Sequence, residues 1–102
     1  MGRSWNLLGI GGANLFMGKY EDAIPYLKES VELGPPSYIR HLFLAACYAA
    51  LGREEEAKAE NGEVLRLHKN FSLNKYIKRL PAKDPEFLEL LVEAFRKTGL
   101  PE

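Results

Sequence analysis

Apolar residues recur at helical spacing along nearly the whole chain, and short polar segments containing glycine or proline separate the helical stretches. In the second stretch Ala23, Ile24, Leu27, Val31 and Leu33 form an apolar stripe with charged residues between them. This spacing is typical of an amphipathic helix. The same reasoning predicts six helices, over residues 4–17, 21–33, 38–51, 54–67, 72–79 and 85–98.

Glycine and proline mark the ends of the predicted helices. Gly18 and Gly52 end the first and third helices, and the segment 34–37 separates the second from the third, with Ser37 as the expected N-cap. Asp84 before Pro85 gives the last helix a cap and a proline at its first position. The last helix therefore has a defined start, and its strong apolar face must bury itself on another element.

The chain contains an internal repeat of 34 residues. Five residues of the first turn and second helix recur at the same spacing: Gly18, Glu21, Ala23, Glu29 and Leu33 return as Gly52, Glu55, Ala57, Glu63 and Leu67. Ile10-Gly11 returns as Leu44-Ala45, and Ala13 returns as Cys47. A fixed period of this length is the signature of stacked helical hairpins, and small residues at these positions allow two helices to approach closely.

The repeat resembles the tetratricopeptide repeat (TPR) family, most clearly in the segment from Gly18 to Ile24. The resemblance implies an all-α, TPR-like helical hairpin solenoid in one domain, with repeats over 4–36 and 37–70. The period fails after Leu67, because Glu86 and Leu91 stand where Gly52 and Ala57 would recur. Since about three repeats are usually needed for a stable stack, we expect residues 71–102 to cap the two repeats.

The resemblance also implies a groove lined by the first helix of each repeat. The corresponding positions are Trp5, Leu8, Leu15, Phe16, Ile39, Leu42, Ala46 and Ala49. These residues are apolar or small, so either a protein or peptide partner or the chain's own tail is expected to cover them, with Trp5 as the anchor of a partner. The basic and asparagine residues with which some family members grip a carboxylate are replaced here by Leu8, Gly12, Leu42 and Ala46.

Composition narrows the functional classes. The 102 residues include 14 basic and 14 acidic residues, so no net charge draws the chain to nucleic acid or to an anionic membrane. The longest apolar run, from Leu42 to Leu51, is too short to cross a bilayer. One cysteine cannot form an internal disulfide, which favours the cytoplasm. Because the sequence starts within a repeat and has no leader, we expect the native chain to be longer.

Candidate catalytic and cofactor groups have simpler structural interpretations. The glycines between Gly9 and Asn14 resemble a dinucleotide loop, but no strand precedes them and helix packing explains them. His41 and His68 have no cysteine or carboxylate at metal-ligand spacing, and Cys47 lies at a core position where a thiol is inert. We therefore expect no enzyme activity, no cofactor and no metal site in this segment.

One stretch carries uncompensated positive charge. Between Val64 and Ala82 there is no acidic residue, Phe71 and Tyr76 are interleaved, and the basic residues are Arg66, Lys69, Lys75, Lys78 and Arg79. This basic patch favours an acidic protein partner or a solvated surface. The neutral total charge argues against nucleic acid as the partner of this patch.

Residues 52–102 resemble the carboxyl-terminal TPR segment of bacterial class III adenylate or guanylate cyclases. The resemblance is carried by Gly52-Arg53, by Arg66-Leu67 with Asn70-Phe71-Ser72, by Leu80-Pro81 with Lys83-Asp84-Pro85, and by the segment 99–102. It implies a regulatory or oligomerisation module for an upstream cyclase domain, with self-association as one mode of action. The alternative is a stand-alone adaptor that binds a peptide in the apolar groove.

Overall fold

The computed structural model describes residues 3–34, 36–79 and 85–101, and within them it contains six helices and no strand. The helices are α1 (Arg3–Phe16), α2 (Tyr20–Leu33), α3 (Tyr38–Ala50), α4 (Glu54–Leu67), α5 (Leu73–Lys78) and α6 (Pro85–Arg96). Each of the six predicted helices is confirmed, and no helix end differs from its prediction by more than two residues. The expected cap at Asp84 lies outside the described residues.

The same turn joins the helices of both hairpins. Gly18 and Gly52 have φ angles of +76° and +77°, in the left-handed region where glycine is favoured. In the first turn the Lys19 amide donates to the carbonyl of Asn14 at 2.8 Å, and 34 residues later the Arg53 amide donates to the carbonyl of Tyr48 at 2.8 Å. The sequence repeat is therefore also a repeat of backbone geometry.

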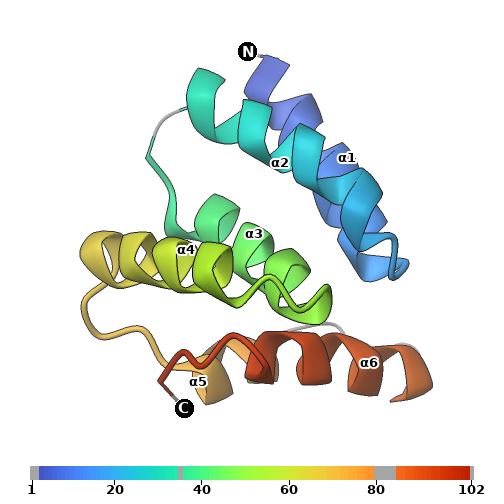
Figure 1. Cartoon of the computed structure of the whole chain (residues 1–102), viewed down its shortest axis with the longest axis vertical. Coiled ribbons are helices and arrows are strands. Elements are labelled where there is room, and N and C mark those ends of the chain that lie inside the picture. The colour runs from blue at the N-terminus through green and yellow to red at the C-terminus, as the bar shows by residue number, and fades with distance from the viewer. Residues whose placement is uncertain (1–2, 35, 80–84, 102) are drawn as a thin grey trace.

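The helices stack in layers (Figure 1). The hairpin α1–α2 packs on the hairpin α3–α4 through α2 and α3, and α6 packs against α3 from the other side. This is an all-α, TPR-like stack of two hairpins closed by two further helices. Phe95, one residue of the predicted apolar face of the last helix, is fully buried in the core that it shares with the repeats.

Aromatic rings connect all the layers. Phe16 of α1 contacts Phe43 of α3 (ring centroids 5.8 Å apart), and Phe43 lies 6.5 Å from Phe95 of α6. The ring centroids of Phe95 and Tyr76 of α5 lie 5.5 Å apart, and those of Tyr76 and Phe71 lie 6.2 Å apart. Because the chain of contacts is continuous, α5 and α6 form part of one core with the two hairpins.

Two glycines of α1 lie where helices approach closely. A Cβ atom on Gly11 would lie 2.7 Å from Leu27 of α2, and one on Gly12 would lie 3.2 Å from Phe43 of α3. Residues 9–14 are helical. The packing interpretation is therefore confirmed for Gly11 and Gly12 but not for Gly9, which has nothing within 4 Å of its Cβ position.

The segment after α6 is tied to the second hairpin. The side-chain amide of Asn61 donates to the carbonyl of Thr98, and the Leu73 amide donates to the carbonyl of Pro101 at 2.8 Å. Thr98 is buried, with its hydroxyl donating to the Phe95 carbonyl at 2.6 Å. These bonds hold the tail across α4 and the start of α5.

Candidate functional site

The predicted groove is largely closed. Leu15, Leu42 and Ala46 have 1% or less of their surface exposed and belong to the core, so the chain itself covers them and a partner does not. The physical reason is that α1 and α3 pack on each other while α6 covers α3. These three side chains are therefore not available to a partner.

Four other predicted groove residues remain at the edge of the core. Leu8, Phe16, Ile39 and Ala49 are partly buried and pack against the core cluster. The side chain of Trp5 lies outside the described residues. The surface that the groove offers to a partner is therefore smaller than the sequence predicts.

A cleft lies where α3 begins, α4 ends and α5 follows. Its volume is about 210 Å³, and its walls include Tyr38, His68, Phe71, Tyr76, Lys75 and Arg79. Tyr38 and His68 stack edge to face with centroids 4.8 Å apart, and Phe71 lies 5.7 Å from Tyr38 and 5.8 Å from His68. We call this the basic cleft, since both of its charged lining side chains are cations.

The basic cleft contains part of the predicted basic patch. Lys75 and Arg79, four residues apart at α5, both line it and are exposed. Lys69 and Lys78 are also exposed, but among the described residues they do not line the cleft. The structure thus brings together two of the five predicted basic residues.

Arg66 is already paired within its own helix. Its guanidinium donates to the carboxylate of Glu63 at 2.7 Å, and this bond lowers the pKa of Glu63 and raises the pKa of Arg66. A charge neutralised by a neighbour contributes little to binding an anion. We therefore exclude Arg66 from the candidate site.

The cleft walls are suited to holding a carboxylate. Burial raises the pKa of Tyr76 to about 12, so its hydroxyl keeps its proton. Tyr76 lines the same cleft as Lys75 and Arg79, and arginine binds carboxylates with paired hydrogen bonds. Sequence reasoning found Lys75, Arg79, Phe71 and Tyr76 but missed Tyr38, because that residue lies far from them in the chain, at the start of α3.

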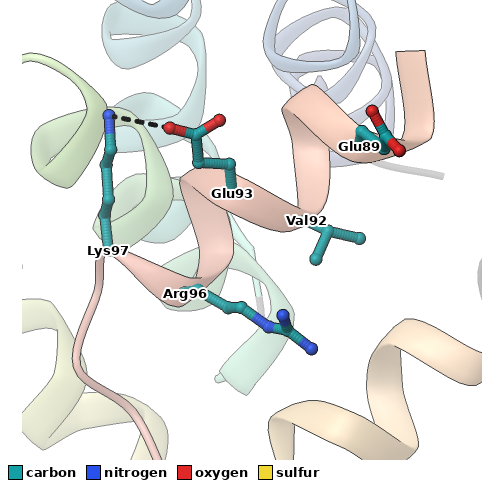
Figure 2. Close-up of a pocket in the computed structure, with 5 residues that line it drawn as sticks. All are labelled: Glu89, Val92, Glu93, Arg96 and Lys97. Carbon is teal, nitrogen blue, oxygen red and sulfur yellow. Dashed lines mark ion pairs between the residues drawn. The ribbon is translucent and has the colours of Figure 1, made fainter. Parts of the chain in front are cut away.

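A second hollow, of about 480 Å³, runs along α6. Figure 2 shows its residues, Glu89, Val92, Glu93, Arg96 and Lys97, with an ion pair between Glu93 and Lys97 at 3.7 Å. Of its described lining residues, two are acidic, two are basic and one is apolar. Because these charges balance, this hollow has weaker selectivity for a charged partner than the basic cleft.

The remaining candidate residues, His41 and Cys47, have structural roles. Nδ1 of His41 lies 2.7 Å from Oε1 of Glu60, which joins α3 to α4, a pair that sequence spacing did not reveal. Cys47 is fully buried, and burial raises the pKa of its thiol to about 12. Within the described ranges no three His, Cys, Asp or Glu residues form a metal site, and no helix is long and apolar enough to cross a membrane.

Comparison with known families gives one match. Residues 17–80, well over half of the chain, match the family model described as Tetratricopeptide repeat. No curated protein and no solved structure matches the chain.

Proposed function

The chain belongs to the tetratricopeptide repeat family, and from this we propose that it is a non-catalytic module that binds an acidic segment of a partner protein in the basic cleft. TPR repeats generally mediate protein–protein interaction. The observation that carries the proposal is the arrangement of Lys75 and Arg79 beside the aromatic walls of that cleft.

The physical basis is local charge on a neutral protein. No acidic residue occurs between Val64 and Ala82, and neither Lys75 nor Arg79 has a carboxylate partner among the described residues. The rings of Tyr38, Phe71 and His68 pack together and line one side of the cleft. A carboxylate bound there would meet two exposed cations beside the aromatic wall of the cleft.

The setting that we propose is the carboxyl-terminal region of a bacterial adenylate cyclase-like signalling protein in the cytoplasm. The motifs within residues 52–102 support it, and we assign residues 4–36 and 37–70 to two repeats and 71–102 to the cap. The alternative is a stand-alone adaptor that uses the partly buried side chains of Leu8, Phe16, Ile39 and Ala49. A gene in which a cyclase domain precedes this segment would support the first setting, and a gene without one would support the adaptor.

Binding of a short fluorescent peptide of alternating glutamate and serine tests the cleft. The double variant Lys75→Gln, Arg79→Gln should weaken binding about five- to tenfold, because each lost ion pair contributes up to about 1 kcal/mol. Binding of the unaltered protein should also weaken as salt is added, since ions screen exposed charges. Fluorescence anisotropy measures both effects.

The matched control is Lys19→Gln with Lys58→Gln, which removes two exposed cations outside the cleft and changes the net charge equally. It should leave the affinity within about twofold, because distant exposed charges are screened. Equal losses in the two double variants would contradict a specific cleft. Absence of binding by the unaltered protein would show that this surface does not accept acidic segments.

A further inference from the structure

A histidine lies in the wall of the basic cleft. His68, the residue that follows α4, lines the cleft together with Lys75 and Arg79. Histidine is the side chain whose charge ordinarily changes between about pH 5 and 8, whereas lysine and arginine keep their charge over this range. The number of positive charges around the cleft can therefore change near neutral pH.

The backbone and two aromatic rings hold the His68 ring in position. The His68 amide donates to the carbonyl of Val64 at 2.8 Å, and the His68 carbonyl accepts a hydrogen bond from the Phe71 amide at 3.1 Å. The ring is partly buried and packs edge to face against Tyr38 and Phe71, with interplanar angles of 89° and 82°. A proton added to this ring would therefore place its charge at the wall of the cleft.

No acidic side chain lines the described part of the cleft. Besides His68, its titratable lining residues are Tyr38 from α3 and Lys75, Tyr76 and Arg79 from the region of α5. Burial raises the pKa of Tyr76 to about 12, so its phenol is neutral wherever a histidine titrates. A charge gained by His68 would therefore add to the two cations without being cancelled inside the cleft.

The surroundings of the cleft leave that charge unpaired and favour it. Charged side chains on the adjoining turns of α3 and α4 either have partners of their own or are cations: Glu60 with His41, Glu63 with Arg66, Arg40 with Ser30, and the exposed Lys69. His68 has no carboxylate partner among the described residues. It also caps the carboxyl end of α4, where the helix dipole favours a positive charge. An anion bound in the cleft would therefore be the partner that a protonated His68 lacks.

We propose that His68 is a proton-dependent third cation of the basic cleft, so that the cleft binds an acidic segment more tightly as the pH falls from about 8 to about 6. The inference rests on the function proposed above, because it concerns the affinity of the same cleft. The two equilibria are linked: a bound carboxylate favours the protonated ring, and the protonated ring favours a bound carboxylate by the same factor. Binding of an acidic segment therefore takes up protons, and acidification strengthens it.

The affinity of the glutamate–serine peptide, measured by fluorescence anisotropy between about pH 5.5 and pH 8, tests this inference. The peptide stays ionised over this range, because glutamate titrates near pH 4.3. The unaltered protein should bind about three- to fivefold more tightly at the acid end, as expected for one further exposed ion pair. The variant His68→Phe keeps an aromatic ring beside Tyr38 and Phe71 but cannot take up a proton. It should therefore bind with the same affinity at every pH.

The matched control is His41→Gln, which removes the other histidine of the sequence, whose ring lies beside Glu60 and outside the cleft. It should leave the pH dependence of binding unchanged. Titration calorimetry in two buffers of different ionisation enthalpy gives a second readout: the unaltered protein should take up protons on binding, and His68→Phe should not. A purely structural role of His68 would weaken binding without changing either readout. If circular dichroism shows that His68→Phe does not fold, His68→Gln takes its place.

The outcomes separate this inference from the proposed function. Equal affinity of the unaltered protein at both ends of the pH range, or a pH dependence that persists in His68→Phe, would overturn the inference and leave the cleft as a site for acidic segments. Loss of the pH dependence in His41→Gln would assign the proton to the other histidine and would also overturn it. Absence of binding at every pH would contradict the proposed function, and the inference with it.

Discussion

At the scale of single residues, glycines of the same helix have opposite roles. Gly9 and Gly11 both lie within α1, where glycine costs about 1 kcal/mol relative to alanine. Space for a methyl group exists at Gly9, because nothing lies within 4 Å of its Cβ position, but at Gly11 that position is 2.7 Å from Leu27. Helix packing therefore requires glycine at position 11 but not at position 9.

The substitution Gly11→Ala should lower the free energy of unfolding by about 1–3 kcal/mol, because Leu27 is fully buried and has little room to move. Gly9→Ala should raise it by up to about 1 kcal/mol through helix propensity. Urea denaturation followed by circular dichroism measures both. Equal stabilisation by the two changes would show that α1 and α2 are not pressed together at Gly11.

At the scale of elements, α6 connects layers that are distant in the sequence. Phe95 is fully buried and contacts Phe43 of α3 and Tyr76 of α5. The two repeats alone would leave this side of α3 uncovered. We therefore attribute the closure of the predicted groove to α6.

The variant Phe95→Ala should have a free energy of unfolding about 3–5 kcal/mol lower, as is usual when a buried aromatic side chain is removed. Backbone amides of α3 should also exchange hydrogen faster. Glu89→Ala, at an exposed position of the same helix, is the control and should change stability by less than about 0.5 kcal/mol. Denaturant unfolding and amide exchange measured by mass spectrometry check these results. Unchanged exchange in α3 in a destabilised Phe95→Ala variant would argue that α6 does not cover it.

At the scale of the whole molecule, burial of weak acids links stability to alkaline pH. Burial raises the pKa of Cys47 from 9.0 to about 12 and that of Tyr76 from 10.0 to about 12. Above pH 9 the unfolded chain therefore releases protons that the folded chain retains. The stability that these groups contribute is fully present below about pH 9 and is lost as the pH rises toward 12, because release of these protons favours the unfolded chain.

The expected profile is a flat free energy of unfolding from neutral pH to about pH 9, followed by a decline. The double variant Cys47→Ala, Tyr76→Phe should flatten the decline, since it removes the two buried acids whose pKa values are raised to about 12. Urea titrations at a series of pH values measure the profile. A decline of equal slope in the variant would assign the effect to other groups.

The helices and turns follow from local sequence. Apolar spacing predicts all six helices, and the repeated glycines predict turns whose hydrogen bonds are indeed the same in both hairpins. The candidate site was less predictable. The sequence reveals Lys75 and Arg79 because they belong to a basic stretch without acidic residues, whereas Tyr38 lines the cleft with them only because the start of α3 and α5 meet in space.

The sequence by itself determined the elements and their repeat, because helix spacing, glycine turns and the 34-residue period depend on residues near one another in the chain. The tertiary structure alone decided which faces are covered. Phe43 of α3 is buried beside Phe95 because α6 returns to α3, and Ile10 is exposed because no described helix stacks on that face of α1. Burial depends on contacts between distant segments, and local spacing specifies an apolar face without specifying what will cover it.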